Sequence, residues 1–484
     1  MPNFDVLVIG GGPAGLAAAT EAARFGLSVA LAERDRLGGT SLWRGPVPVQ
    51  ALQHCGAVAD LVRRAPRFGV TVGDVRVDFP AVLDRVKTVV RAIQPRRGPE
   101  RLRKLGIEIF HEQAAFTDRS TLAVGDQEVR AKRLILATGH RIAAPPIDGL
   151  AETGYLVPRQ VWDLERLPKS LIVLGASAMG LELAQALARL GSTVTVVEQG
   201  PQILPDEDAE LVGLLVEALQ AEGVSFRTGA EAVQVLRRGD SKMVALRAGL
   251  PAVASAKAGE AREELQAEEV LVAAERVPDV DGLNLAATRI ETTRTGIVVD
   301  GHLRCAERRV WAVGDCNGLV PWAHAAEIQA RAAVHDALFL WSRKADLRRL
   351  GWAVLTDPAL AHAGLTEAKA REKYGDRVRV YRQPLAEVDG AVCRAETVGL
   401  AKLIADRQGR LVGGHILSAS AGEMLPALAR AVAERRPAGS LAAQFHAYPT
   451  LAGAMALVSR RARDEQVYSG WRLAVLKQLA RWHV

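Results

Sequence analysis

One arrangement of apolar and polar positions occurs twice along the chain. Residues 5–33 and 169–198 each read as an apolar strand, a glycine-rich turn, a long alanine-rich helix, a second strand and a terminal acid. In both copies the acid follows the first glycine by 23 residues. These pairs are Gly10 with Glu33 and Gly175 with Glu198. The repeat predicts two β-α-β units within one chain.

Outside the repeat, three further segments read as strands that end in turns. They are residues 131–140, 270–282 and 308–318, and the first is expected to return to the sheet of the first repeat. A weak polar stretch lies near 237–266. From about residue 346 the pattern changes to alternating strands and helices, which indicates a separate α+β unit. The predicted fold class is α/β, with two Rossmann-like units followed by this α+β domain.

Composition narrows the class of protein without naming its chemistry. A chain of 484 residues should form roughly three domains, and 49% apolar with 24% charged residues is typical of a compact globular protein. The net charge of +7 is scattered, which favours general attraction to anions over a nucleic-acid site. No apolar run reaches about 18 residues, and no leader precedes the first strand, so we expect a cytoplasmic protein.

The four cysteines stand far apart, with no paired spacing between them. They are Cys55, Cys305, Cys316 and Cys393. This spacing excludes both a disulfide framework and a zinc knuckle, and it fits a reducing compartment.

The first glycine-rich turn has the pattern of a phosphate-binding loop. Gly10, Gly12 and Gly15 form a GxGxxG sequence between a predicted strand and a predicted helix. Backbone N–H groups and the helix N-terminus can hold a pyrophosphate there, and Glu33 suits a ribose hydroxyl. One such turn is weak evidence, but two turns with acids at the same offset predict two dinucleotide sites.

The second turn carries Gly175, Ser177 and Gly180, so its middle position is less open to a phosphate than glycine would leave it. Tight packing of a helix on a strand by small residues is the alternative interpretation of this turn. Glu198 would hydrogen-bond a ribose 2′-hydroxyl but repel a 2′-phosphate, and the two residues after it offer no arginine instead. NADH is therefore favoured over NADPH.

Several motifs occur in an order that belongs to one known family. They are GGGPAG with Glu33, LGGT at 37–40, ILATG ending at Gly139, the second glycine turn with Glu182, AERVPDVDGL, WAVGD ending at Asp315, and HAYPTL at 446–451. Across nearly its whole length the chain resembles the pyridine nucleotide-disulfide oxidoreductases, which include dihydrolipoamide dehydrogenase, mercuric reductase and the soluble transhydrogenase.

The resemblance implies a homodimer that binds FAD and a nicotinamide nucleotide. The implied domains are an FAD-binding domain over 1–150 with a return segment over 276–345, an NAD(P)-binding domain over 151–275, a dimerisation domain over 346–460, and a basic amphipathic tail over 461–484. In the family, the segment at Thr138 and Gly139 lies against FAD, and Asp315 contacts the ribityl chain. The residues expected at the FAD site are Gly10, Gly12, Pro13, Ala14, Gly15, Glu33, Gly39, Thr40, Thr138, Gly139, Gly314 and Asp315. Those expected at the NAD site are Gly175, Ser177, Gly180, Glu182 and Glu198.

The chain departs from the family where the redox disulfide should be. The family pattern after LGGT is C-x4-C-x-P-x-K, but here Ser41, Pro46 and Gln50 stand at the two cysteine positions and the lysine position. A serine hydroxyl cannot supply a thiolate near neutral pH, and proline has no side-chain nucleophile. Cys55 is no substitute, because nine helical residues would place it more than about 13 Å from Pro46. We interpret Cys55 as a buried structural cysteine, and a redox role is the less favoured alternative.

The acid-base groups of the family are also incomplete. Tyr448 precedes Pro449 where disulfide-reducing members carry histidine, and Gly453 replaces the orienting glutamate. Tyr448, His446 and Glu182 remain candidate catalytic groups. His446 and His324 could also be structural histidines, since a single histidine in an apolar setting usually is. Without its lysine partner, Glu182 would form at best a neutral hydrogen bond with Gln50.

The predicted function is hydride transfer from NADH to FAD, followed by direct transfer to a non-disulfide acceptor such as a quinone, a dye, oxygen or another nicotinamide. One alternative is a catalytically silent flavin-binding scaffold. Another is a reductase of a disulfide supplied by a partner at a cleft lined by Trp43 and Arg44.

The last residues predict an amphipathic helix. Its apolar face would carry Trp471, Val475, Leu479 and Trp482. Packing against the dimer body is favoured over weak contact with a membrane surface, because one short basic helix binds lipid weakly.

Overall fold

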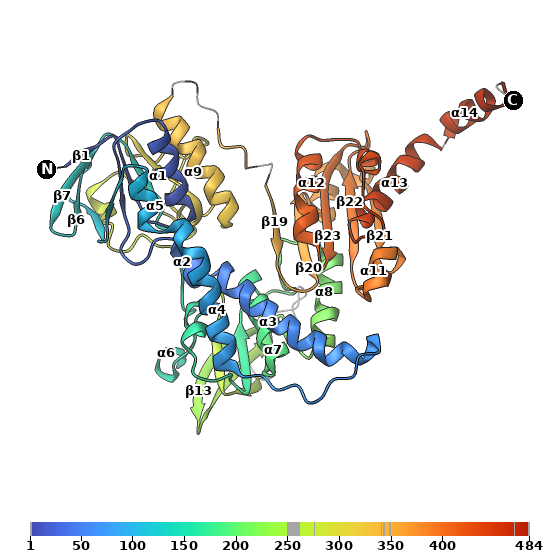
Figure 1. The fold of residues 1–484 in the computed structure, drawn as a ribbon, viewed down its shortest axis with the longest axis horizontal. Helices are drawn as coiled ribbons and strands as arrows, with labels where there is room; N and C mark the ends of the chain where they lie inside the picture. The colour runs from blue at the N-terminus through green and yellow to red at the C-terminus, as the bar shows by residue number, and fades with distance from the viewer. Residues whose placement is uncertain are drawn as a thin grey trace. The chain divides into compact units, whose positions relative to one another are not determined.

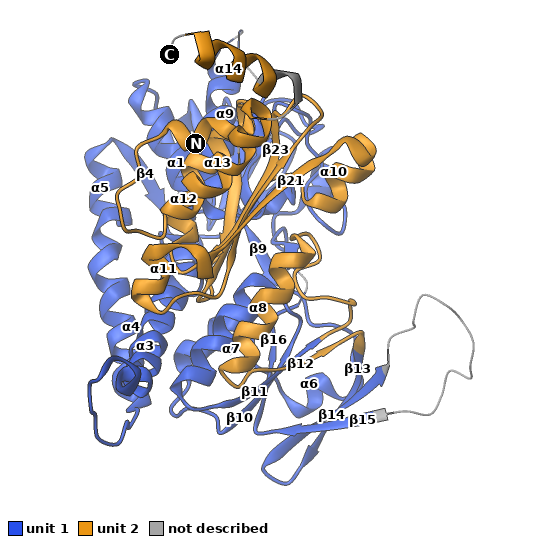
Figure 2. Ribbon diagram, turned by 90° about the vertical axis from the view of Figure 1, so that its right-hand side faces the viewer, with its two compact units in different colours: residues 1–197, 231–248, 254–347 blue, residues 198–230, 249–253, 348–484 orange. Residues whose placement is uncertain are grey.

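The computed structural model divides the chain into two compact units (Figure 2). It describes residues 2–248, 262–274, 276–339, 341, 344–347, 350–468 and 470–482, so the segments predicted near 237–266 and 270–282 lie partly outside the described residues. The first unit comprises the described residues of 1–197, 231–248 and 254–347, and the second those of 198–230 and 348–484.

The main sheet of the first unit has five parallel strands in the order β18-β8-β2-β3-β4. The strands are β2 (Val6–Ile9), β3 (Val29–Ala32), β4 (Ile107–Phe110), β8 (Leu134–Leu136) and β18 (Val310–Ala312). Helices α1 (Pro13–Arg24) and α9 (Ala323–Leu338) lie side by side (Figure 1) and bury alanine-rich faces in the same core. Strands β8 and β18 lie within the predicted segments 131–140 and 308–318, and β8 returns to β2 as expected.

The second repeat forms the second predicted β-α-β unit. Strand β10 (Ser170–Leu174) pairs in parallel with β11 (Thr193–Glu198) and with β16 (Glu269–Val272). Helix α7 (Ala178–Leu190) is buried along most of its length, and α3 (Pro46–Arg64) packs against it. Burial on both sides explains why α7 reads as an almost continuous apolar run rather than as an amphipathic helix.

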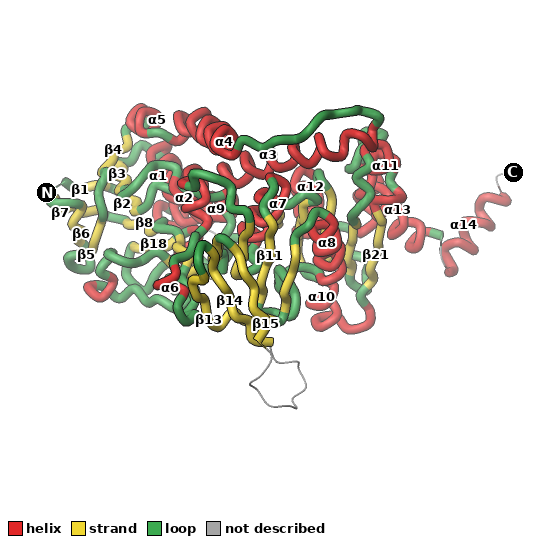
Figure 3. Tube along the Cα trace, turned by 90° about the horizontal axis from the view of Figure 1, so that it is seen from below, coloured by secondary structure: helices red, strands yellow, loops and turns green. Residues whose placement is uncertain are grey.

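The remaining elements of the first unit are short helices and small sheets. The helices are α2 (Gly39–Trp43), α4 (Phe79–Ile93), α5 (Pro99–Lys104) and α6 (Leu150–Thr153). The strands are β1 (Asn3–Phe4), β5 (Ala114–Phe116), β6 (Thr121–Val124), β7 (Gln127–Ala131), β9 (His140–Ile142), β13 (Ala230–Arg238), β14 (Ser241–Ala248), β15 (Arg262–Ala267) and β17 (Arg276–Pro278). Figure 3 shows β13, β14 and β15 side by side, so the described parts of the polar stretch contribute strands.

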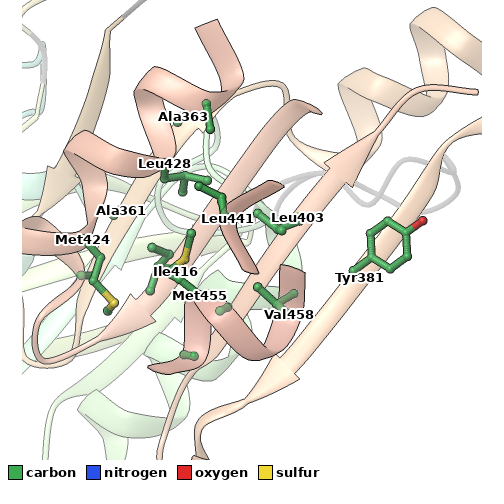
Figure 4. Packing of buried hydrophobic residues seen from close by; sticks show 14 of the residues in the cluster. Ala361, Ala363, Tyr381, Leu403, Ile416, Met424, Leu428, Leu441, Met455 and Val458 are labelled. Atoms are coloured by element: carbon green, nitrogen blue, oxygen red, sulfur yellow. The ribbon is translucent and has the colours of Figure 1, made fainter. Parts of the chain in front are cut away.

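The second unit contains an antiparallel sheet in the order β19-β20-β23-β22-β21. Its strands are β19 (Gly351–Val354), β20 (Ala359–Gly364), β21 (Arg379–Pro384), β22 (Leu400–Ala405) and β23 (Leu411–Ser418). One face packs against α12 (Ala421–Ala433) and α13 (Gly453–Val467), and Figure 4 shows the buried residues of this core, among them Leu403, Ile416, Leu428 and Val458. This is the α+β architecture expected after residue 346.

Two helices occupy the end of the described chain. Helix α13 (Gly453–Val467) extends past residue 461, where the tail was predicted to begin. Its Met455, Val458 and Ala462 are buried. The shorter α14 (Gly470–Trp482) carries the exposed Val475, Leu479 and Trp482, whereas the side chain of Trp471 lies outside the described part. No helix among the described residues is long and apolar enough to cross a membrane.

The other face of the sheet in the second unit carries a row of basic side chains, of which all but Arg382 are buried. His362, His415, Lys402 and Arg382 stand opposite one another on four adjacent strands. Helix α8 (Ala209–Ala221) contacts β23 on this face, and α10 (Glu367–Tyr374) does so as well. Both helices begin beside the row and bring acidic residues to it.

Lys402 lies at the centre of this charged layer. It is 2% exposed, and its Nζ is 2.8 Å from Asp208, 2.7 Å from Glu210 and 2.8 Å from Glu367. Arg382 pairs with Glu210 and Glu367 at 2.8 and 2.7 Å. Burial alone would raise the pKa of Glu210 and of Glu367, but hydrogen bonds from these basic groups outweigh it and lower both pKa values.

Replacing Lys402 by methionine should destabilise the second unit by roughly 3–5 kcal/mol, because Asp208 would become a buried carboxylate without its cation. The matched control is Lys369→Met, which removes an exposed ion pair with Asp206 and should cost no more than about 1 kcal/mol. Denaturant titration followed by circular dichroism measures both. Equal midpoints for the two variants would contradict the proposed role of the layer.

The same layer should make the wild-type protein sensitive to acid. A carboxylate whose pKa is lowered by folding stabilises the protein above its unfolded pKa of about 4.3, and this stabilisation is lost as pH falls through the folded value. Glu210 and Glu367 are both shifted in that direction. We expect the denaturant midpoint of the wild type to decrease as the pH is lowered below about 4. The midpoint of Lys402→Met should decrease less steeply over the same pH range.

Candidate functional site

The turn between β2 and α1 is held by two contacts that only glycine permits. Gly10 has φ of 104°, and a Cβ placed there would lie 2.3 Å from the carbonyl oxygen of Ala137. A Cβ on Gly15 would lie 1.7 Å from the carbonyl oxygen of Gly10. Gly12 caps α1 without crowding, since its Cβ would meet nothing within 4 Å. The N-terminus of α1, with Pro13 in its first turn, is therefore open to an anion.

Glu33 is held in position by the same turn. Its Oε2 accepts a hydrogen bond of 2.6 Å from the Gly11 N–H, and its Oε1 accepts one of 2.8 Å from the Asp35 N–H. Glu33 also lines an open pocket together with Gly10 and Thr138. The structure thus brings the predicted acid and the predicted phosphate-binding turn to one pocket.

The loop before α2 packs directly on this turn. A Cβ on Gly39 would lie 2.7 Å from Cα of Gly12, and the Gly38 N–H donates to the Gly11 carbonyl at 2.8 Å. Thr40, the next predicted residue, is exposed. These two segments are held together by backbone contacts that leave no room for side chains at Gly38 or Gly39.

Thr138, Gly139, Gly314 and Asp315 lie where β8 and β18 end. Thr138 Oγ1 is buried and has no hydrogen-bond partner among the described residues, and a Cβ on Gly139 would meet nothing within 4 Å. A Cβ on Gly314 would lie 3.1 Å from that of Ala14, which brings this strand end against α1. A buried hydroxyl without a partner, beside open backbone, fits a polar cofactor at this position.

His140 is a residue of this site that the sequence interpretation missed. Its Nδ1 lies 2.6 Å from Oδ2 of Asp315, and both side chains are at most one-fifth exposed. The position directly after Gly139 was the only available signal. Asp315 is therefore oriented by a neighbouring imidazole of the protein itself.

These residues fit FAD. The N-terminus of α1 would hold its pyrophosphate, Glu33 its ribose, and Thr138 with Asp315 the part beside the flavin, as the sequence predicts. When bound, FAD supplies a reversible two-electron acceptor.

The segment at the degenerate redox positions is divided between two helices. Ser41 lies in α2, Pro46 is the first residue of α3, and Gln50 is one turn further on. Helix α3 runs unbroken to Arg64, which confirms the helical geometry that separates Cys55 from Pro46. Cys55 is half-buried rather than fully buried, and burial raises the pKa of its thiol.

Two of the other cysteines, Cys305 and Cys316, offer no thiolate in place of the lost pair. Burial raises the pKa of Cys316, which follows Asp315, to about 11, and it raises the pKa of Cys305 still further. Cys393 is exposed and belongs to the second unit. At neutral pH Cys305 and Cys316 are therefore neutral thiols, which are poor nucleophiles.

Trp43 and Arg44 are engaged within their own segment. Trp43 Nε1 donates to the Leu37 carbonyl at 2.8 Å, and the Arg36 guanidinium stacks 5.0 Å from the centre of its ring. Arg44 pairs with Asp35 at 3.1 Å. These contacts give no support to a docking cleft formed by the two side chains.

The second glycine turn repeats the first with one change. A Cβ on Gly180 would lie 2.7 Å from the Gly175 carbonyl oxygen, the same close approach as in the first unit. The Ser177 hydroxyl accepts from the Gly180 N–H at 3.2 Å and donates to the Ala273 carbonyl at 2.6 Å. Ser177 is thus the N-cap of α7, and its hydroxyl is bound to the protein.

Glu198 ends β11, and its Oε1 accepts from the Gly200 N–H at 2.8 Å. This bond orients the carboxylate that would select a ribose hydroxyl.

Glu182 is buried on α7, where α3 packs against it. Gln53, one turn beyond Gln50, donates from Nε2 to the Glu182 carbonyl at 2.7 Å and to Gln185 at 3.3 Å. The sequence interpretation missed Gln53, because a glutamine on an amphipathic helix ordinarily predicts an exposed position. Gln50 and Glu182 lie on these two packed helices.

Tyr448, His446 and His324 each have contacts of their own. Tyr448 is 82% exposed, and its hydroxyl donates to Asp389 at 2.9 Å, which raises its pKa. His446 Nε2 donates weakly to the Leu441 carbonyl at 3.3 Å. Both belong to the second unit, whereas His324 is exposed on α9 of the first.

The chain is similar to known flavoenzymes along most of its length. Residues 4–330 match the family model for pyridine nucleotide-disulphide oxidoreductases, and residues 351–458 match that for their dimerisation domain. The chain is 33% identical to a dihydrolipoyl dehydrogenase of Chlorobaculum tepidum, covering 93% of this chain and 95% of that protein. It is 31% identical to a mercuric reductase of Streptomyces lividans, covering 95% and 96%.

Two solved structures have the same fold. LpdA from Mycobacterium tuberculosis superposes with a TM-score of 0.83 at 27% identity, covering 95% of this chain and 99% of that one. A Cu(II) complex of a mutant of the HOCl-induced flavoprotein disulfide reductase RclA from Escherichia coli has a TM-score of 0.83 at 25% identity, with the same coverage. These matches confirm the predicted α/β fold class. They also confirm the predicted cofactors, FAD and NAD(P)H, on which the family depends.

Gly12→Ala should weaken FAD binding by at least about tenfold, or 1.4 kcal/mol, while leaving the fold intact. Gly12 has φ of −75°, which alanine adopts freely, and its Cβ would project only into the space where a pyrophosphate approaches. Titration of the apoprotein with FAD, followed by quenching of flavin fluorescence, measures the affinity.

Gly73→Ala is the matched control. Gly73 lies in a loop, and a Cβ at this position would also meet nothing within 4 Å. An unchanged FAD affinity in Gly12→Ala would contradict the assignment of the turn.

Proposed function

Because the chain belongs to the pyridine nucleotide-disulphide oxidoreductase family, we propose that it is an FAD-dependent NADH oxidoreductase that reduces a non-disulfide acceptor directly. The observation that carries this proposal is the pair Ser41 and Pro46, which stand where the family has its redox cysteines. The acceptor would be a quinone, a dye, oxygen or another nicotinamide.

The dinucleotide geometry supports catalysis over a silent scaffold. Both glycine turns keep their close approaches, and both acids are oriented by backbone N–H groups. Positioning is the main contribution a protein makes to hydride transfer, because the cofactor carries the chemistry. A scaffold that binds only flavin would not need the second glycine turn or the oriented carboxylate of Glu198.

The residues of this chain would have positioning roles rather than a thiol relay. Thr138 and Asp315 would hold the flavin end of FAD, with His140 orienting Asp315 through the 2.6 Å contact. Glu182, packed against α3, would lie beside the nicotinamide. Tyr448 and His446 remain candidates for the partner's contribution to the site, in keeping with the family's dimers.

A homodimer is part of this proposal. Residues 351–458 match the dimerisation-domain model, and the segment before Pro449 presents Phe445 at 99% exposure and Tyr448 at 82%. Large exposed aromatic side chains are enriched at protein interfaces and costly to leave in water. A second copy of the chain would cover them.

Anaerobic titration with NADH should reduce the flavin completely with one equivalent, and no thiolate charge-transfer band should appear. Two equivalents would be required if the chain held a redox disulfide beside the flavin. The flavin absorption spectrum measures both outcomes. Cys55→Ala is the control and should leave the stoichiometry unchanged.

A need for two equivalents, or turnover of lipoamide or glutathione disulfide by the isolated protein, would contradict the proposal. A flavin that NADH does not bleach would favour the scaffold alternative.

Glu198→Ala should lower the preference for NADH over NADPH by about tenfold or more, because a hydrogen bond to a charged group is worth about 1.5–3 kcal/mol. The ratio of kcat/KM for the two nucleotides, with any dye as acceptor, measures this. Glu231→Ala, which removes an exposed acid from β13, is the control and should leave the ratio unchanged. An unaltered ratio in Glu198→Ala would contradict the proposed selectivity.

A further inference from the structure

Three buried polar side chains of the second unit converge at one end of the basic row. Glu207 precedes α8, His362 lies on β20, and His415 stands directly opposite His362 on β23. They are 7%, 2% and 0% exposed. One oxygen or nitrogen atom of each lies within 4.8 Å of the other two. None of the three takes part in the dinucleotide sites described above.

The tautomer of His362 is fixed by its backbone neighbour. Its Nε2 is 2.8 Å from the Gly364 carbonyl, and because a carbonyl only accepts, this nitrogen must donate. Its Nδ1 then faces Oε2 of Glu207 at 2.8 Å. A neutral imidazole with Nε2 protonated would place a lone pair against a carboxylate, so a proton or another cation must lie between these atoms.

His415 is oriented in the same way. Its Nε2 donates to the Leu365 carbonyl at 3.0 Å, and its Nδ1 is buried without a hydrogen-bond partner in the described part of the chain. A buried acceptor without a partner costs about 1–3 kcal/mol. The carbonyls of Gly364 and Leu365, two consecutive residues, thus bind both Nε2–H groups, so that Nδ1 is the ring nitrogen left to coordinate an ion in each histidine.

This arrangement is the one that metal-binding histidines adopt. A histidine ligand usually donates its second ring N–H to a carbonyl or carboxylate, which fixes the tautomer and the ring. Tetrahedral zinc with bonds of about 2.1 Å separates its ligand atoms by about 3.4 Å, so Nδ1 of His362 and Oε2 of Glu207, now 2.8 Å apart, would move apart by about 0.6 Å on binding. Trp352 stacks on His362 at 4.0 Å and donates to Oε1 of Glu207 at 2.6 Å, so the carboxylate is held as well.

The distribution of charge also favours a cation beside Glu207. Lys402 and Arg382 face Asp208, Glu210 and Glu367, whereas the Glu207 carboxylate contacts the neutral indole of Trp352 and the imidazole of His362. A buried carboxylate needs a cation or a shared proton.

We propose that Glu207, His362 and His415 form a binding site for a divalent transition-metal ion of the zinc class, coordinated through Oε2 and the two Nδ1 atoms. The ligand set of two imidazoles and one carboxylate suits zinc and its neighbours rather than magnesium or calcium. The ion would bridge α8 to two strands of the sheet and thereby stabilise the second unit. The site is independent of the proposed function.

The test uses the full-length flavoprotein, freed of metal with a chelator and then titrated with Co²⁺ and with Zn²⁺. Wild type should bind one ion per chain, show the visible absorption of four-coordinate Co²⁺, and gain thermal stability with Zn²⁺. His362→Gln and His415→Gln should each lose the bound ion and the Zn²⁺-dependent shift. His111→Ala, which removes an exposed histidine of the first unit, should retain both.

The FAD content and the elution volume of each variant show whether it has folded. If a variant fails to fold, X-ray absorption of the wild-type zinc complex still tests the proposal. Two imidazole nitrogens in the first coordination shell are expected. Absence of histidine from that shell, absence of any tightly bound ion, or binding that survives in both folded glutamine variants would overturn the proposal.

Discussion

The close approach of one glycine to the carbonyl of another is the constraint on which both nucleotide-binding units depend. Gly15 leaves no room for a Cβ against Gly10, and Gly180 repeats this contact against Gly175. Because the helix starts so near the strand end, its unpaired N–H groups face outward from the sheet, where an anion can reach them. The positions of the acids Glu33 and Glu198 then follow from the length of the chain, because one helix and one strand separate each acid from its turn. Cofactor binding is thus a property of backbone geometry.

The redox segment can change without disturbing that geometry. Ser41 and Pro46 sit in a short helix and at the first turn of the next, so neither is needed for the β2–α1 turn or for the α3–α7 packing. Proline suits the first position of a helix because its missing N–H would have no partner there. Proline at position 46, in place of the family's cysteine, therefore removes a nucleophile and favours the start of α3. The residues at the redox positions and those that build the fold are therefore separable at this point of the chain.

The sequence predicted the repeat, the returning strands β8 and β18, the α+β unit and the glycine turns, because each has a local periodicity or a turn with steric requirements. It did not predict His140 beside Asp315, since their 175-residue separation leaves no local signal. Lys402 and His415 were missed for another reason. A polar residue in an alternating strand predicts a solvent-facing side. Here that side is covered by α8, which comes from a segment almost 200 residues earlier.

The covered face also explains why the second unit has two unlike cores. On one face, aliphatic residues pack against α12 and α13, which any volume-conserving set could satisfy. On the other, each cation requires a particular carboxylate, so the register of β20, β21, β22 and β23 and the position of α8 are fixed together. A slip of one residue would move Lys402 and His415 into the aliphatic face, where no acid could reach them. The ionic layer therefore contributes specificity of pairing, whereas the aliphatic face contributes most of the buried apolar area.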